Sequence, residues 1–391
     1  MRKELYIAMR IVIDLLIAEK EPGGMLFAGR ALLEGLARIE SDNEYIVITA
    51  RSRAYQALLR DTPQCGSISI HNVRLFSWRG LLVQHQVIVP EIMRRLKPDL
   101  LHVPTFVAPI GWQGPLVITV HDLAFLHRSQ SLPLYARLYW QSLLYESVRR
   151  AQGIIAISER TRDELTTFWH IPPERIHLIH NAIRSSLPYN AVLPTHVQAM
   201  QRRYGSRYLL HVGRIVPHKN VETLIAAFEL IADRFPDLHL VLSGGVGAGS
   251  AGVLQQIEQS AYRSRIHQVG WVSDYDLGVL YTGASALVFP SHYEGFGLPT
   301  LEAMAFQIPV VASPEAAHEE ITGEAVLRVD CTHPASLATA LTNLLTDSAL
   351  RTRLIRLGQQ QVQSFTVEAC ARATCRVYEQ VYQQTCLSSP A

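Results

Sequence analysis

Short apolar runs alternate with amphipathic segments along most of the chain. In the first half, apolar runs that predict β-strands cover residues 10–15, 44–50, 67–73, 100–103, 116–120, 153–157 and 176–179. Apolar residues at helical spacing lie between them, at residues 25–39, 82–96, 135–151 and 159–168. Repeated alternation of strand and helix is typical of a parallel sheet covered by helices, so the pattern predicts an α/β fold.

The alternation weakens around residues 183–201. The segment IRSSLPYNAVLPTHVQAMQ holds two prolines, an asparagine and several hydroxyl residues, which favour a joint between domains. Afterwards strands are predicted at residues 208–212, 239–243, 266–269, 286–289, 310–312 and 325–329, and helices at 221–235, 250–263, 274–284, 334–345, 350–362 and 367–384. We therefore predict two α/β domains, residues 1–190 and 191–366, and a C-terminal helical segment, residues 367–391.

Composition excludes some classes of function. The 391 residues are 48% hydrophobic, enough for two large cores, and no apolar run reaches the roughly 18–20 residues of a membrane-spanning helix. Residues 1–190 hold 22 basic against 17 acidic residues, and the rest hold 14 against 17. So small an excess argues against nucleic acid as a partner and leaves peripheral contact with an anionic membrane surface as a minor alternative.

Cysteine usage and the N-terminus bear on location. The five cysteines are scattered and form no Cys-x-x-Cys pair, which favours reduced thiols in a cytoplasm. The N-terminal run MRKELYIAMRIVIDLL is interrupted by acidic residues and has no small-residue cleavage site, so we expect no signal peptide. Residues 1–8 are interpreted as an extension before the first strand. His177 and His180 lack supporting ligands, and no metal site is expected.

In open parallel sheets, ligands bind beyond the carboxyl ends of the strands. In the first half, Gly24 ends a Gly-Gly pair before a predicted helix, whose free N–H groups suit a phosphate, although such turns are common. His121 directly follows the strand at residues 116–120. It is placed to hydrogen-bond a substrate, or else it satisfies a turn.

The second half carries stronger signals. Arg214 and Lys219 follow the strand at residues 208–212, and Asn220 is placed to cap the next helix. An arginine fork and a lysine point charge beside a helix start favour a diphosphate. The chain has four lysines against 32 arginines, and Lys219 is the only lysine in the second half. A merely solvated cation would more naturally be arginine here, so the lysine favours function.

The stretch SHYEGFGLPTLEAMA carries Glu294 and Glu302, with seven residues between them. Pro299 suits the first turn of a helix beginning near Leu298, and the free N–H groups of that turn suit a phosphate. The two carboxylates are suited to sugar or ribose hydroxyls; the alternative is that both are simply solvated. With the two cations, they predict a nucleoside diphosphate carrying a polyhydroxylated group. The glycine-rich residues 244–249 lack the dinucleotide fingerprint and are interpreted as a loop lining the nucleotide pocket.

The chain resembles glycosyltransferase family four, whose members are retaining, nucleotide-sugar-dependent enzymes. Their GT-B fold consists of two Rossmann-like domains facing across a cleft. The matching segments, in the order of the family, are PGG, VHDLAFLH, AQGIIAISERTRDEL, PPERIHLIHNAI, YLLHVGRIVPHKNVETLIAAF, VGWVSDYDLGVLYTGASALVFPSHYEGFGLPTLEAMA and PVVAS. The paired glutamates make the sixth segment highly specific. Phe306 and Gln307 depart from the small residue and glycine of many relatives, which changes a helix end and no catalytic position.

The resemblance implies roles for the candidates. Arg214 and Lys219 match the pair that binds the donor diphosphate, Glu294 the glutamate that contacts the transferred sugar, and Glu302 the one that holds the ribose. His121 matches a histidine beside the donor sugar. The implied donor-binding positions also include Gly24, Gly213, Gly244, Val272, Phe296, Gly297 and Leu298. The resemblance also implies that residues 1–190 bind the acceptor, that residues 191–366 bind the donor, and that the C-terminal helix in residues 367–391 crosses back to the N-terminal domain. The family needs no metal and no cofactor besides its donor substrate.

The expected function is retaining transfer of a hexosyl group, mannosyl or glucosyl, from a nucleoside diphosphate sugar to a hydroxyl of a sugar, glycan or lipid-linked acceptor. The expected location is the cytoplasm or the inner face of the membrane. Three alternatives stay open: a non-catalytic nucleotide-sugar-binding partner, a GT-B epimerase, and a phosphorylase. A phosphorylase would need a cofactor-binding lysine in a half that has only Lys219. The sequence leaves the donor base, the sugar and the acceptor undetermined.

Overall fold

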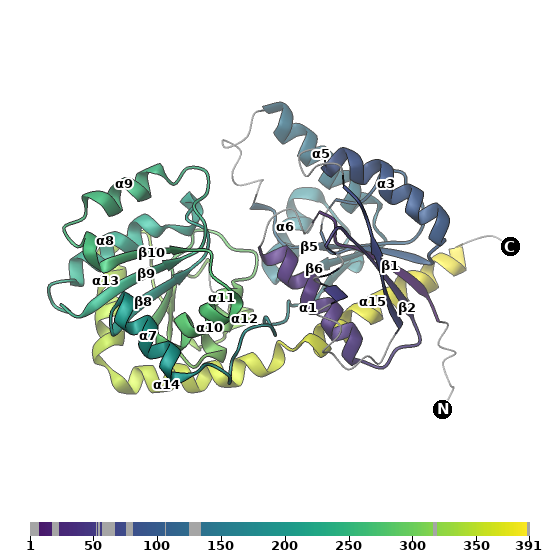
Figure 1. Cartoon of the computed structure of the whole chain (residues 1–391). Helices are drawn as coiled ribbons and strands as arrows, with labels where there is room; N and C mark the ends of the chain where they lie inside the picture. Colours follow the sequence, from purple (N-terminus) through teal and green to yellow (C-terminus); the bar gives the residue numbers. More distant parts are fainter. Residues whose placement is uncertain are drawn as a thin grey trace. The chain divides into compact units, whose positions relative to one another are not determined.

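The computed structural model describes residues 8–17, 23–51, 53, 55–56, 67–75, 81–105, 107–124, 134–315 and 319–388. The chain divides into two compact units, one of residues Met1–Ala182 with Phe365–Ala391 and one of residues Ile183–Ser364. Each unit is a parallel sheet with helices packed on it (Figure 1). The predicted fold class of two Rossmann-like α/β domains is therefore confirmed. The division after Ala182 falls earlier than the boundary that we predicted after residue 190.

The first unit holds a seven-stranded sheet in the order β3-β2-β1-β4-β5-β6-β7, with all neighbours parallel. Its strands are β1 (Arg10–Asp14), β2 (Glu44–Thr49), β3 (Ser67–Asn72), β4 (Leu100–Val103), β5 (Leu116–Val120), β6 (Gly153–Ala156) and β7 (Ile176–Leu178). Its helices are α1 (Gly24–Arg38), α3 (Leu81–Leu96), α5 (Leu134–Arg150), α6 (Glu159–Trp169) and α15 (Val367–Ser388). Every predicted strand of this half forms.

Helices cover both faces of the central strands, and successive strand residues point to opposite faces, whereas the edge strand β3 is largely exposed. Ile11 and Ile13 of β1 pack in one cluster with residues of α1 and α15. Val12 packs in another cluster with residues of α3, α5 and α6. The last helix of the chain thus completes the core of the first unit, where it packs along α1 and against β5 and β6.

The second unit holds a six-stranded parallel sheet in the order β10-β9-β8-β11-β12-β13. Its strands are β8 (Arg207–Val212), β9 (Leu238–Ser243), β10 (Ile266–Gly270), β11 (Ala286–Phe289), β12 (Val310–Ala312) and β13 (Val326–Arg328). Its helices are α7 (Pro194–Tyr204), α8 (Val221–Ile231), α9 (Ala251–Gln259), α10 (Asp274–Gly283), α11 (Leu298–Ala305), α12 (Glu319–Thr322), α13 (Pro334–Thr346) and α14 (Ser348–Gln361).

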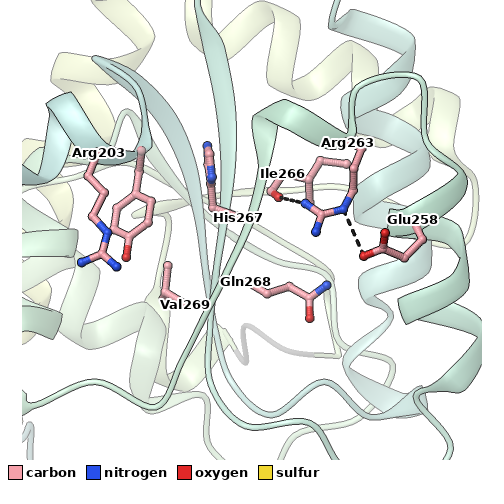
Figure 2. Close-up of a pocket in the computed structure, with 8 residues that line it drawn as sticks. Arg203, Glu258, Arg263, Ile266, His267, Gln268 and Val269 are labelled. Atoms are coloured by element: carbon pink, nitrogen blue, oxygen red, sulfur yellow. Dashed lines mark hydrogen bonds and ion pairs between the residues drawn. The ribbon is translucent and has the colours of Figure 1, made fainter.

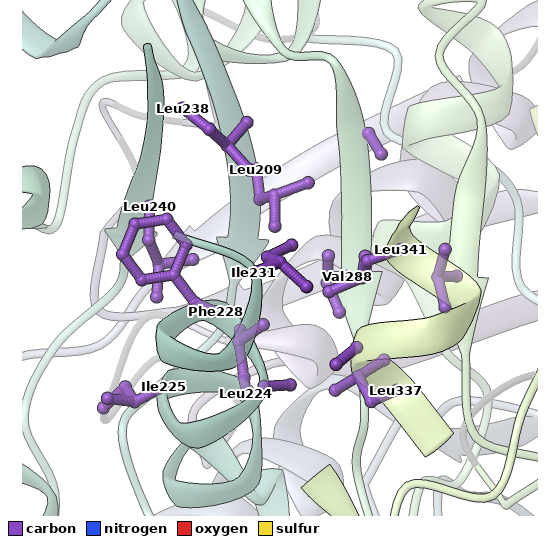
Figure 3. Close-up of a cluster of buried hydrophobic side chains, with 14 of the residues drawn as sticks. Leu209, Leu224, Ile225, Phe228, Ile231, Leu238, Leu240, Val288, Leu337 and Leu341 are labelled. Carbon is purple, nitrogen blue, oxygen red and sulfur yellow. The ribbon is translucent and has the colours of Figure 1, made fainter. Parts of the chain in front are cut away.

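The core on one face of this sheet lies between the central strands and two helices (Figure 3). Leu209 and Leu240 of the strands meet Phe228 of α8, and Val288 of β11 lies beside Leu341 of α13. These side chains are fully buried. The packing holds β8, β9 and β11 rigidly, so the loops at their carboxyl ends start from fixed positions.

One element was missed where we predicted a joint. Helix α7 begins at Pro194, in a segment whose prolines we interpreted as breaking order. Proline is well tolerated in the first turn of a helix, because that turn has no intrahelical N–H bond to lose. None of the residues of α7 is buried, so its apolar periodicity is weak. Two helix ends also differ: α8 stops at Ile231 and α9 at Gln259, earlier than predicted.

Two further observations concern the described part of the chain. None of its helices is long and apolar enough to cross a membrane. Its four cysteines, Cys331, Cys370, Cys375 and Cys386, are free thiols.

Candidate functional site

Glycines join the strand ends at which the predicted site lies. The Gly213 N–H, after β8, donates to the Ser243 carbonyl at the end of β9 (2.8 Å). Gly244 has φ 140°, and a Cβ placed on it would lie 2.1 Å from the Gly213 carbonyl oxygen. Its own N–H donates to the Gly270 carbonyl at the end of β10 (2.8 Å). Only a residue without a side chain fits at Gly244, which brings three strand ends together.

Lys219 and Glu294 form an ion pair in the second unit. Lys219 ends a short 3-10 turn (Pro217–Lys219) after β8, and Glu294 lies in the loop between β11 and α11. The Lys219 Nζ also lies 5.1 Å from the centre of the Phe289 ring, within range of a cation–π contact. The two side chains are only 16% and 13% exposed. The structure therefore excludes the alternative that Glu294 is simply solvated.

A main-chain hydrogen bond holds the two loops together, because the His292 N–H donates to the His218 carbonyl (2.8 Å). Asn220 adds a second link, but the role that we predicted for it is wrong. It adopts a left-handed conformation, φ 55°, and its side chain makes no cap hydrogen bond with α8. Instead, its Nδ2 donates to the carbonyls of Cys331 (2.7 Å) and Pro290 (3.2 Å). Asn220 thus fastens the Lys219 turn to the end of β11.

His211 is a buried polar residue of this region that we did not predict as part of the site. It is fully buried in β8, its ring stacks on Phe289, and its Nδ1–H donates to the Val288 carbonyl (3.1 Å). Burial lowers the pKa of His211 to about 4, so the ring is neutral at physiological pH. The available signal was a histidine interrupting the apolar run YLLHV.

Helix α11 starts where the sequence predicted. Gly297 precedes it in the left-handed region, φ 88°, Leu298 is its first residue, and Pro299 lies in the first turn. The side chain of Thr300 donates back to the Gly297 carbonyl (2.7 Å), which fixes the turn. Phe296 is buried beneath the loop. Pro299 has no N–H and the Thr300 N–H donates to the Gly297 carbonyl (2.9 Å), so the Leu298 N–H and the helix dipole are what suit an anion here.

Glu302, one turn into α11, is completely buried. Its Oε2 accepts a hydrogen bond from Tyr281 (2.8 Å), and its Oε1 lies 3.0 Å from Nη2 of Arg184. Burial and the nearby carboxylate raise the pKa of Tyr281 well above its usual range, which keeps its hydroxyl a donor. The alternative of a solvated Glu302 is excluded. Its contact with ribose hydroxyls stays a prediction, since its carboxylate is engaged by side chains of its own unit.

The remaining predicted residues of the second unit border the same loops. Arg214 is exposed, and its Nη2 would lie 3.6 Å from a Cβ placed on Gly247 in the glycine-rich loop. Its guanidinium therefore lies near the loop that we predicted to line the nucleotide pocket. Val272 is half-buried in the turn between β10 and α10.

Two predicted residues belong to the first unit. Gly24 is the first residue of α1, and a Cβ placed on it would meet none of the described residues within 4 Å. His121 directly follows β5, is 7% exposed, and its Nε2–H donates to the Pro104 carbonyl (2.9 Å). Burial lowers the pKa of His121. The neutral ring then carries its lone pair on Nδ1, which makes it an acceptor for a hydroxyl.

A pocket of about 420 Å³ lies elsewhere in the second unit, along the edge strand β10 (Figure 2). Within it, Arg263 donates to Glu258 (3.1 Å) and to the Ile266 carbonyl (3.3 Å), so its charge is already paired. The described residues that line this pocket include none of the predicted site residues. The concentration of paired charges and a helix N-terminus at β8 and β11 is the better candidate site.

Comparison with known proteins gives matches over both units. Residues 23–187 match the family model described as Glycosyltransferase Family 4, and residues 195–361 match the model described as Glycosyl transferases group 1. The chain is 30% identical over 294 residues to the O-antigen chain mannosyltransferase B of Escherichia coli, covering 73% of this chain and 76% of that protein. It is 27% identical over 227 residues to the O-antigen chain mannosyltransferase RfbU of Salmonella typhimurium, covering 58% of this chain and 60% of that protein.

Among solved structures, the fold is similar to that of HepE from Anabaena, crystallised in complex with UDP and glucose. The TM-score is 0.73 at 19% identity, and the match covers 95% of this chain and all of that one. At this identity the likeness establishes the fold, and with it the GT-B type of two Rossmann-like domains.

Proposed function

Because this chain belongs to glycosyltransferase family four, it is a hexosyltransferase, and we propose that it transfers a mannosyl group, with retention, from a nucleoside diphosphate donor to a glycan hydroxyl. The names of two relatives, both O-antigen mannosyltransferases, support mannose and a polysaccharide acceptor. The glucose and UDP bound in HepE support a nucleoside diphosphate sugar as donor and keep glucosyl transfer as the second candidate. We further propose a lipid-linked acceptor at the cytoplasmic face of the membrane.

The observation that carries the proposal is the Lys219–Glu294 pair beside the start of α11. A cation that is about five-sixths buried and already held by a carboxylate costs little reorganisation when a diphosphate arrives. Arg214 adds a second cation near the glycine-rich loop, and Leu298 adds one main-chain N–H at the start of α11. This set matches the needs of a diphosphate leaving group.

In the proposed reaction, the bond between the anomeric carbon and the donor phosphate oxygen breaks, and its electron pair goes to the diphosphate. The acceptor oxygen bonds to the anomeric carbon on the same face, and its proton passes to a donor phosphate oxygen. Lys219, Arg214 and the N-terminal end of α11 stabilise the growing negative charge, as electrostatic preorganisation rather than acid catalysis. The role that we propose for His121 is to accept a hydrogen bond from a sugar hydroxyl at Nδ1.

We assign Glu294 to binding a sugar hydroxyl rather than to nucleophilic attack. A carboxylate paired with Lys219 is a weakened nucleophile, because the cation stabilises its charged ground state. A carboxylate oxygen not facing Lys219 can still accept a hydrogen bond from a hydroxyl. We propose no metal and no cofactor, so activity should persist in excess EDTA.

The test is a panel of GDP-mannose, UDP-glucose and other nucleotide sugars, with nucleotide release measured with and without a glycan acceptor. Transfer should depend on the acceptor, and NMR of the product should show the donor's anomeric configuration. An inverted product would refute retention. No nucleotide release from any donor would instead favour the non-catalytic binding partner.

Lys219→Ala and Glu294→Ala should each lower kcat by roughly 100- to 1,000-fold while leaving the thermal unfolding transition cooperative, because Lys219 stabilises the charge growing on the diphosphate and Glu294 holds both Lys219 and the sugar in place. Arg207→Ala, which removes a half-exposed partner of Asp237 in the same unit, is the matched control and should retain activity. Near-normal turnover of either site variant at saturating donor would contradict its assigned role.

A further inference from the structure

The segment that follows Ala182 is anchored on the candidate site by one arginine. Arg184 Nη1 lies 3.2 Å from Asp274 Oδ1 in the first turn of α10, and its Nη2 lies 3.0 Å from Glu302 Oε1 in α11. Ser186 also donates to Asp274, at 2.5 Å. The chain enters the second unit at Ile183, so these contacts lie at the very start of that unit.

Burial makes the Arg184–Glu302 ion pair sensitive to the loss of either partner. The Arg184 side chain is 11% exposed, and Glu302 is 0% exposed. Besides Arg184, the Glu302 carboxylate receives a hydrogen bond from Tyr281. A carboxylate removed from water needs a compensating charge, and removing one partner of such a pair leaves the other buried and uncompensated. Arg184 is the cation that meets this need.

The planar shape of the Arg184 guanidinium allows it to contact two carboxylates at once. Its two terminal nitrogens reach carboxylates on two different helices, an arrangement that suits the planar fork of arginine better than the point charge of lysine. The N-terminus of α10 and the middle of α11 are thereby fixed relative to each other. α11 begins at Leu298, four residues before Glu302, so its orientation sets the direction of the Leu298 N–H and the helix dipole proposed to meet the diphosphate.

We propose that Arg184 is a positioning residue of the donor site, which orients the Glu302 carboxylate and α11 and joins them to the segment entering the second unit. This inference rests on the proposed function, because it assumes that α11 meets the donor. Arg184 acts through Glu302 and α11 and needs no contact with the donor. Its loss should therefore weaken donor binding under conditions in which the second unit is still folded.

The experiment compares Arg184→Met with Arg265→Met in the full chain. Arg265 is a partly buried arginine of the same unit that donates to the carbonyls of Ala232, Phe235, Pro236 and Leu238, away from α11. Calorimetric Kd values for GDP and UDP, and the donor KM and kcat, are measured where both variants remain folded. Arg184→Met should raise the Kd of the bound nucleotide and the donor KM roughly ten- to 100-fold, with a smaller change in kcat. Arg265→Met should leave Kd within about twofold.

Arg184→Lys covers the case in which Arg184→Met does not fold. Lysine restores a charge for Glu302 but lacks the fork whose second nitrogen holds Asp274, so Kd should rise severalfold. Glu302→Gln supplies the second arm of the experiment. In that background Arg184→Met should raise the nucleotide Kd by a clearly smaller factor than it does alone, because no buried carboxylate is left to compensate.

Any of four results would overturn the inference. These are an unchanged Kd and KM in Arg184→Met, wild-type affinity in Arg184→Lys, an equal loss of nucleotide affinity in Arg265→Met, and full additivity of Arg184→Met with Glu302→Gln. These results leave wild-type transfer intact and so refute the positioning role alone. A wild-type chain that binds neither nucleotide and releases none from any donor would refute the proposed function, and the positioning role with it.

Discussion

Replacing Gly244 with alanine places a methyl group where the loops after β8 and β9 touch. The added Cβ would lie 2.1 Å from the Gly213 carbonyl oxygen and 2.5 Å from its carbon, well under the 3.0 Å that real Cβ contacts observe. The obstacle is main chain, which has no rotamer to move away. The Gly244 φ of 140° is also a conformation that side-chain-bearing residues rarely adopt.

The magnitude follows from these two effects. The unfavourable backbone conformation costs about 1–3 kcal/mol. Displacing the Gly213 peptide weakens its hydrogen bond to Ser243, worth about 0.5–1.5 kcal/mol. A combined loss of about 2–4 kcal/mol in the free energy of unfolding should lower the Tm of a unit of this size by about 4–16 °C.

The assay is thermal unfolding followed by circular dichroism, with the adjacent Gly245→Ala as the control. A Cβ on Gly245 would meet nothing within 4 Å, so its substitution should change stability by less than about 0.5 kcal/mol. Because Gly244 also joins the ends of β8, β9 and β10, nucleotide affinity should fall with it. Equal Tm values for the two variants would refute the close approach of these loops.

Two other predictions concern the first core and acid stability. Gly35→Ala should lower the Tm by several degrees, because its Cβ would lie 2.1 Å from the Val367 carbonyl where α1 meets α15. Gly29→Ala is the control and should be tolerated, because its Cβ would meet only the end of the Leu15 side chain. Similar Tm values for the two variants would contradict that packing. His211, with a folded pKa of about 4 against an unfolded value of 6.5, favours the folded state above pH 6.5, and this stability is lost as the pH falls from 6.5 to 4. His211→Gln should therefore flatten the loss of stability across this range, by up to roughly 1.4 kcal/mol per pH unit, as measured by urea unfolding; an unchanged slope would contradict its burial as a neutral ring.

Much of the fold was predictable because its signals are local. Apolar runs such as LVITV at residues 116–120 formed strands at their predicted positions, since both faces of the central strands of each parallel sheet are covered. Pro299 marked the first turn of α11 for a reason confined to one residue, its missing N–H. Helix α7 escaped prediction because none of its residues is buried, which leaves little periodicity to detect.

The candidate site was predictable only in part. The residue types and their spacing identified Lys219 and Glu294 as separate site residues, and only the structure joins them as an ion pair. His211 was missed, because a single histidine in an apolar strand does not show which way it points. Asn220 was assigned to the wrong partners, because an asparagine before a helix looks the same whether it caps that helix or turns away.

The sequence by itself therefore determined two parallel α/β sheets, the loops in which chemistry is concentrated and the family to which they are similar. Only the tertiary structure decided that Glu302 is enclosed by Tyr281 and Arg184, and that Asn220 bonds the Cys331 carbonyl 111 positions away. The physical reason is one of range. Periodicity and turn chemistry act between near neighbours, whereas the partner of a buried polar group is set by which distant segments the two cores bring together.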